Sequence, residues 1–278
     1  MVGASTTVFA IHGGLTEKAH SMEETMRKKI SAIAIKGFAV FVVLGTVYLG
    51  TANQAMGQDA ATPYPKMAPV DQYLMERNAE IQLARSAAPD SISSAATVLV
   101  LGRQGYETAV EGKNGFVCMV GRAWMGMFDW PEFWSPKVRA ADCLNPQAAR
   151  WVLPIAYLRA RMVMAGRSKA EIVSALKSAF DNKQLPNLEG GAMDYMMSKS
   201  AYLTDQGDHN VPHVMFYTAL EDGKDWGAGA SGSPVLAAPY WFLSSEQASQ
   251  AKGLPPILVF LVGVGNWSDG TPAPMHHE

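Results

Sequence analysis

Two helical segments joined at residues 166–168 constrain the fold more than any other feature of the sequence. Gly166 is a typical helix terminator, because glycine readily adopts the left-handed conformation that ends a helix. Ser168 and Glu171 have the spacing of a capping box, which satisfies free backbone N–H groups at a helix start. The second helix is expected to end near Asn182 and to turn four apolar residues inward: Ile172, Val173, Leu176 and Phe180.

The first helix of this pair opens at Asn145-Pro146, a capping residue followed by a first-turn proline. Pro154 interrupts the segment, and proline inside a helix removes a backbone hydrogen bond. The sequence therefore predicts that the continuous part begins near Leu153. Its buried face is expected to carry Ile155, Leu158 and Met162.

Strand-like runs lie on both sides of the helix pair. An Asn114-Gly115 turn between two such runs is typical of a hairpin, and predicts a three-stranded antiparallel meander over 97–121. Strands, a helix pair and more strands indicate an α+β domain, with the helix pair packed on a mainly antiparallel sheet. The later runs are 193–197, 211–218 and 257–264, the last suited to a central strand, and a helix is expected between Val70 and Ala88.

Residues 26–57 have the layout of a secretory signal peptide. A basic start at Met26 is followed by an apolar run at 37–50, which is too short to span a bilayer comfortably, and by small residues up to Gly57. We expect cleavage after Gly57, or alternatively after Ala55, and interpret 1–25 as an over-long start. In the competing interpretation Met1 is the true start and 30–50 is an uncleaved membrane anchor.

The remaining chain is expected to hold a Pro-rich leader at 58–69, one domain at 70–271 and a disordered tail at 272–278. From Gln58 onward it has 18 Lys and Arg against 22 Asp and Glu, a net charge of about −4 with no basic cluster. Nucleic-acid binding is disfavoured, because it requires clustered cations. The signal segment is the only part expected to contact a membrane, and then only if it is not cleaved.

Two cysteines, Cys118 and Cys143, occur in the whole chain. A periplasmic or secreted location is oxidising, and there such a pair is expected to form one disulfide. Two separate buried thiols are the alternative.

An aromatic cluster over residues 124–134 is the first candidate site. Large flat rings are common on surfaces that bind a glycan, a peptide or another protein. The alternative is a loop that uses its aromatic residues to cover the core and is held by the cysteine pair. The candidate binding residues are Trp124, Phe128, Trp130 and Trp134.

A second candidate site contains Asp208, His209 and His213, whose side chains are all possible zinc ligands. Pro212 argues against a helix, and in a strand the two histidines would lie about 13 Å apart. His213 alone is a candidate general base, and Asp208 is the other candidate catalytic residue. In the alternative, His213 forms a structural hydrogen bond and His209 is exposed.

The Gly-rich segment 227–232 matches the GxGxxG pattern but lacks the preceding strand and following helix of a dinucleotide site. We interpret it as a flexible loop next to the aromatic loop. No cofactor is expected.

Residues 106–122, with Asn114-Gly115-Phe116-Val117-Cys118, and residues 212–217 resemble a group of exported bacterial proteins without an assigned activity. The likeness covers residues 90–220. It implies a bacterial, exported, single-domain protein and transfers no catalytic residue.

Together these features predict an exported protein that binds an unknown glycan, peptide or protein ligand through the aromatic loop. A metal-assisted hydrolase using Asp208, His209 and His213 is the alternative, and a purely structural domain is a third possibility.

Overall fold

The computed structural model describes residues 63–206, 210–220 and 222–274. The chain divides into the units Met1–Gly57 and Gln58–Glu278, and every described residue belongs to the second. The predicted signal peptide therefore lies outside the described residues. Within the described part, no helix has the length and apolar character needed to cross a membrane.

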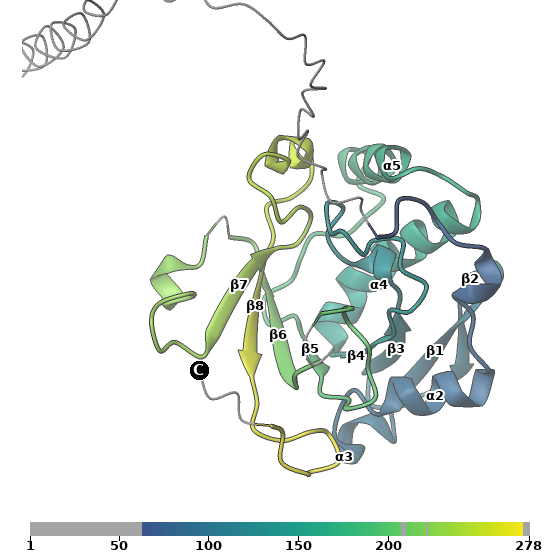
Figure 1. Ribbon diagram of the computed structural model, residues 1–278, viewed down its shortest axis with the longest axis vertical. Helices are drawn as coiled ribbons and strands as arrows, with labels where there is room; N and C mark the ends of the chain where they lie inside the picture. The colour runs from purple at the N-terminus through teal and green to yellow at the C-terminus, as the bar shows by residue number, and fades with distance from the viewer. Residues whose placement is uncertain (1–62, 207–209, 221, 275–278) are drawn as a thin grey trace, which may run out of the picture. The chain divides into compact units, whose positions relative to one another are not determined.

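An eight-stranded sheet runs through the described part of the chain in the order β2-β1-β3-β4-β5-β6-β8-β7 (Figure 1). Neighbouring strands are antiparallel except β1 and β3, which are parallel. The predicted α+β class with a mainly antiparallel sheet is thus confirmed. The strands are β1 Thr97–Gly102, β2 Gly105–Val110, β3 Val117–Gly121, β4 Ala140–Leu144, β5 Met193–Met196, β6 His213–Thr218, β7 Val235–Pro239 and β8 Leu258–Gly263.

Helices pack on both faces of the sheet. Because side chains alternate along a strand, Val98 and Cys118 join the cluster that includes Ala84 of α2, whereas Leu99 and Met119 join the larger core beneath α4. The result is a three-layer arrangement (Figure 1). One face carries α2 Arg77–Arg85 and α3 Asp90–Ser93, and the other carries α4 Pro146–Met164 and α5 Lys169–Asp181.

The predicted helix pair is confirmed in α4 and α5. The Asn145 side chain accepts a hydrogen bond from the backbone of Ala148, and Ser168 and Glu171 form the complete capping box. Gly166 adopts a φ of 71°, as a helix terminator should. These caps involve residues only a few positions apart, so the sequence alone specifies them.

The predicted start of α4 is wrong. The helix is continuous from Pro146 through Pro154 to Met164, instead of beginning near Leu153. Pro154 lies on the half-buried outer side of the helix, and Arg150, whose carbonyl would otherwise accept from residue 154, is exposed. The cost of one lost hydrogen bond is offset by the packing of the opposite face, where Trp151 and Ile155 are fully buried.

The predicted three-stranded antiparallel meander over 97–121 is wrong for its third strand, β3. β2 pairs with β1 as expected, but β3 does not turn back onto β2; it lies beside β1 in parallel. The connecting segment crosses the start of β1, because the N–H groups of Lys113 and Asn114 donate to Ala95 and that of Thr97 donates to Phe116. Gly112 permits this crossing, since a Cβ there would lie 2.1 Å from the Thr97 nitrogen.

The later strands follow the predicted runs closely, as β5, β6 and β8. β8 lies between β6 and β7, inside the sheet. β4 and β7 were not predicted, because their sequences, Ala-Ala-Asp-Cys-Leu and Val-Leu-Ala-Ala-Pro, are poor in the β-branched and aromatic residues typical of strands. The helix expected from Val70 to Ala88 is shorter: a 3-10 turn at Val70–Gln72 precedes α2.

Cys118 and Cys143 lie directly opposite each other on β3 and β4 and form a disulfide. The predicted bond is therefore confirmed. Both residues are fully buried against α2, and the bond joins the two strands that flank residues 122–139. The long aromatic segment is thus anchored at both ends by a covalent link.

Candidate functional site

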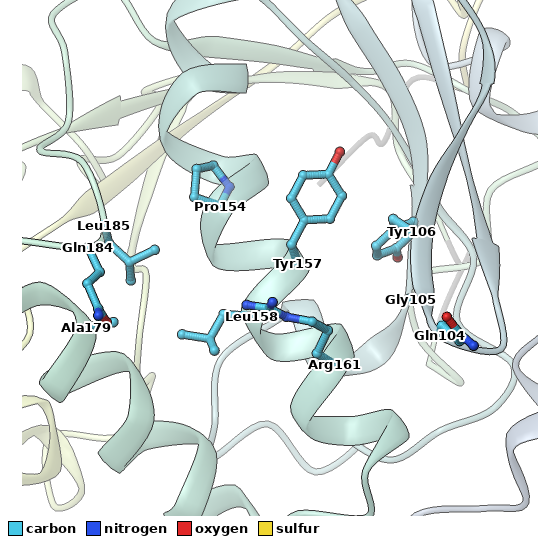
Figure 2. A pocket seen from close by; sticks show the side chains of 10 residues that line it. All are labelled: Gln104, Gly105, Tyr106, Pro154, Tyr157, Leu158, Arg161, Ala179, Gln184 and Leu185. Carbon is cyan, nitrogen blue, oxygen red and sulfur yellow. The ribbon is translucent and has the colours of Figure 1, made fainter.

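A groove follows the outer side of α4. Two depressions form it, one of about 520 Å³ and a shallower, more open one of about 430 Å³, and they adjoin because Pro154 and Tyr157 line both. The first is shown in Figure 2, with α4 between the β1–β2 turn and the C-terminal end of α5. The volume of each falls in the range of ordinary ligand sites. The groove therefore has the size and the mixed apolar and polar lining of a binding site.

Arg161 supplies a positive charge at one end of this groove. Its guanidinium forms neither a hydrogen bond nor an ion pair with the described residues, and Figure 2 places the side chain beside Leu158 and Tyr157. Arg167, six residues further along and past the end of α4, instead pairs with Glu171. Guanidinium groups pair well with carboxylates, because their planar N–H groups match the two oxygens. Arg161 is therefore available to an anionic ligand group.

The two tyrosines of the groove remain neutral at ordinary pH. Burial raises the pKa of Tyr157 and of Tyr106. The Tyr106 hydroxyl donates to the carbonyl of Val120, so it is committed to the fold. Tyr157 has no hydrogen-bond partner within the described residues and is half-buried, and so offers a ring face and a free hydroxyl.

The unpaired edge of the sheet lies alongside the same groove. β2 is the first strand in the sheet order and pairs only with β1 in the described part of the chain. A Cβ on Gly105 would lie 3.9 Å from the Arg161 side chain, and one on Gly115 would lie 3.0 Å from Pro146. The β2 strand and the turn after it thus border α4 from one end of the groove to the other.

The predicted aromatic surface is largely contradicted. Trp124, Phe128 and Trp134 are buried in the main core, with exposed fractions of 0%, 2% and 7%. Phe128 packs on Phe133 and lies 4.2 Å under the guanidinium of Arg159. These rings cover the sheet, which is the alternative that the sequence left open. These rings are buried because the core is large enough to enclose them, and the sequence pattern does not reveal the size of the core.

Trp130 is the one predicted binding residue that keeps partial exposure. Its ring lies over Gly126 and lines a hollow of about 360 Å³ with Lys169 and Asp129. The Asp129 carboxylate accepts two backbone hydrogen bonds, from Leu243 and Ser244, and is therefore occupied in holding a neighbouring loop.

The Gly-rich loop does not adjoin the aromatic loop. Trp226 at its start stacks on Phe260 at 4.5 Å, whereas Val259, the preceding residue of β8, joins the core beneath α4. Successive residues of a strand face opposite sides. The two loops therefore lie against opposite faces of the sheet, and the Gly-rich segment leads into β7, not into a helix.

Asp208 and His209 lie outside the described residues. His213 is buried at the start of β6, where its Nδ1 is 2.7 Å from the carbonyl of Val211 and burial lowers its pKa. Within the described residues no group of three or more His, Cys, Asp or Glu is placed to hold a metal ion. A metal site at 208–213 stays a prediction, which elemental analysis of untagged protein would decide.

The groove residues were missed because α4 is apolar on two sides. Leu153, Tyr157 and Leu158 are only partly buried, although one apolar face is enough to cover a sheet. These additional apolar residues were the feature of the sequence that could have indicated a groove along α4. Leu158 was instead assigned to the buried face, which it joins only in part.

Comparisons with protein-family models, with curated proteins and with solved structures each find no match for this chain. The resemblance to exported bacterial proteins therefore stays a prediction.

Proposed function

We propose that this protein is a binding module that holds an extended peptide by its C-terminal carboxylate in the groove along α4. The observation that carries the proposal is the unpartnered guanidinium of Arg161 at the end of a long groove, within the described residues. The rest of the lining is mostly apolar or uncharged. A ligand with one carboxylate and an uncharged chain complements it.

The shape of the groove favours a chain over a compact ligand. An α-helix rises about 1.5 Å per residue, so the length from Pro146 to Arg161 is about 22 Å. An extended peptide rises about 3.3 Å per residue, and about six or seven residues would cover that distance. The unpaired edge of β2 offers backbone N–H and C=O groups along the same path, as in other modes of peptide recognition at a sheet edge.

An array of random octapeptides tests this proposal, each made with a free C-terminal carboxylate and as the C-terminal amide. We expect a subset of the free acids to bind, and their amides to bind about ten to a hundred times more weakly, because a charged hydrogen bond is lost. Fluorescence anisotropy measures both affinities. Arg161→Met keeps the apolar stem of the side chain and should reduce affinity for the free acids to that for the amides.

Arg167→Met is the matched control, because Arg167 lies on the turn after α4 and lines neither hollow. It should bind the selected peptides as the unaltered protein does. Retention of no octapeptide would contradict the proposal, as would equal binding of acids and amides by the protein and its Arg161→Met variant.

We further propose that the protein acts in the periplasm or outside the cell. The signal-peptide pattern at 26–57 supports this, and the buried disulfide fits an oxidising compartment. Expressed in a Gram-negative host, the full chain should appear in the periplasm or medium with Gln58 as its first residue. N-terminal sequencing checks this, and recovery of the uncut chain in the membrane fraction would favour the uncleaved anchor.

A further inference from the structure

Another hollow, of about 570 Å³, lies beside the β7–β8 end of the sheet, away from the α4 groove. It is bounded by residues 239–245 and 251–258. Its floor consists of residues that belong to the core: Trp241, Phe242, Leu254 and Ile257 are all buried. Its rim carries two large apolar side chains in contact with solvent, Leu220 and Leu243, which are 38% and 56% exposed. A site with an apolar floor and rim favours an apolar ligand.

The walls of this hollow are held by hydrogen bonds. The indole Nε1 of Trp241 donates to the carbonyl of Pro255 at 2.8 Å, which joins the two bounding segments. The backbone of Tyr240 donates to Ile257 at the start of the hollow. Asp129 accepts the N–H groups of Leu243 and Ser244 from outside it. The hollow is therefore preformed, which reduces the cost of ordering it around a ligand.

One charged residue lines the hollow within the described part of the chain, Lys252. Its side chain is exposed and has neither a hydrogen bond nor an ion pair among the described residues. The only other side-chain polar groups of the lining, apart from the indole, are the hydroxyls of Ser244 and Ser245. A single cation at the edge of an apolar hollow complements a ligand that has one negative charge and an apolar body.

We propose that this hollow binds a single-chain carboxylic acid of the fatty-acid type. The hydrocarbon chain lies on the floor formed by Trp241 and Ile257, and the carboxylate pairs with Lys252. The site is independent of the α4 groove, with which it shares no lining residue. The protein would thus hold two ligands of different chemistry.

Decanoic acid is the probe, measured by isothermal titration calorimetry below the concentration at which it forms micelles. We expect saturable binding of one molecule per chain. Each buried methylene raises affinity by up to about fourfold, so hexanoic acid should bind about ten to a hundred times more weakly. Decan-1-ol tests the head group, since it keeps the chain and lacks the charge.

Two variants separate the chain from the carboxylate. Ala248 lines the hollow and is exposed, so Ala248→Phe fills the space with little risk to the fold and should abolish binding of both probes. Lys252→Gln should weaken decanoic acid about tenfold and leave decan-1-ol unchanged. Lys113→Gln removes an exposed lysine elsewhere and is the matched control. Arg161→Met should bind decanoic acid normally, whether or not the peptide proposal holds.

The proposal is overturned if decanoic acid shows no saturable binding, or if Ala248→Phe binds it as the unaltered protein does. It is also overturned if Lys252→Gln weakens acid and alcohol equally. Self-association that Ala248→Phe abolishes, without any binding of decanoic acid, would assign the hollow to a second copy of the chain instead.

Discussion

Replacing Glu80 by alanine should lower the free energy of unfolding by about 3–5 kcal/mol, because it leaves the charge of Arg122 buried without its partner. The two side chains form an ion pair at 2.8 Å between α2 and the end of β3, and both are about 1% exposed. Glu80 also accepts a hydrogen bond from the backbone of Leu101 on β1. Its loss therefore affects the contact of α2 with two strands.

The rest of the Arg122 environment cannot compensate for the missing carboxylate. The guanidinium also donates to the carbonyls of Tyr73 and Val120, but these carry no net charge. Urea denaturation monitored by circular dichroism measures the loss. The doubly apolar variant Glu80→Leu/Arg122→Met should recover much of it, since a buried ion pair contributes little relative to well-packed apolar residues.

Glu107→Ala is the matched control for this prediction. Glu107 pairs with Arg77, which is on the same helix as Glu80, and the contact is similar in length at 2.7 Å. These side chains are 60% and 49% exposed, so water replaces the lost partner. Glu107→Ala should lower the free energy of unfolding by only a small fraction of the decrease that Glu80→Ala causes. Equal losses in the two variants would contradict the role assigned to burial.

Replacing Asp142 by asparagine should make the protein progressively more stable than the unaltered chain as pH rises from 5 to 8. Asp142 on β4 and Asp194 on β5 lie beneath α4, and Asp194 also accepts a hydrogen bond from the Tyr217 hydroxyl. Burial raises the pKa of Asp194 to about 7, and burial with the neighbouring carboxyl raises that of Asp142. The pair therefore holds a proton that unfolding releases.

The sign follows from proton binding in the two states. Between the usual aspartate pKa near 4 and the folded value near 7, the unfolded chain ionises while the folded pair stays protonated. The unfolded state then binds fewer protons, so stability is present at low pH and is lost as pH rises through this window. His213 acts in the opposite sense, because burial lowers its pKa and stability is lost as pH falls.

Comparing the stability of Asp142→Asn with that of the unaltered protein at each pH cancels the contribution of His213, since both chains keep that residue. For each proton that the folded chain retains and the unfolded chain releases, the free energy of unfolding changes by about 1.4 kcal/mol per pH unit. For a domain of this size we expect the difference in melting temperature to grow by about 5–10 °C between pH 5 and pH 8. Differential scanning calorimetry at matched ionic strength measures it. Asp181→Asn, at the exposed end of α5, should follow the unaltered protein, and a constant difference for Asp142→Asn would contradict the shared proton.

Features that depend on neighbouring residues were predicted from the sequence. The Asn145 cap, the Ser168–Glu171 capping box and the Gly166 terminator each satisfy backbone groups within a few positions of one another. The cysteine pair was also predicted, because only one pairing is possible. The Asn114-Gly115 turn shows the limit of such reasoning. Its local preference for a hairpin was overridden by distant backbone groups at Ala95 and Thr97.

The candidate sites depended still more on tertiary contacts. The tryptophans of residues 124–134 are equally suited to a surface and to a core, and only the packing of Phe133, Phe242 and Arg159 around Phe128 decides between them. The α4 groove is formed by segments far apart in sequence, so no local pattern marks it. Arg161 becomes a candidate because the β1–β2 turn and the end of α5 leave its guanidinium beside an open groove.

The sequence by itself determined the helix pair, the mainly antiparallel α+β class and the disulfide, because each follows from local capping, local periodicity or a single possible pairing. Only the tertiary structure decided the parallel contact of β1 with β3, the burial of the aromatic segment and the position of the α4 groove. Those features depend on which distant surfaces are removed from water together, and that is a property of the whole packed chain.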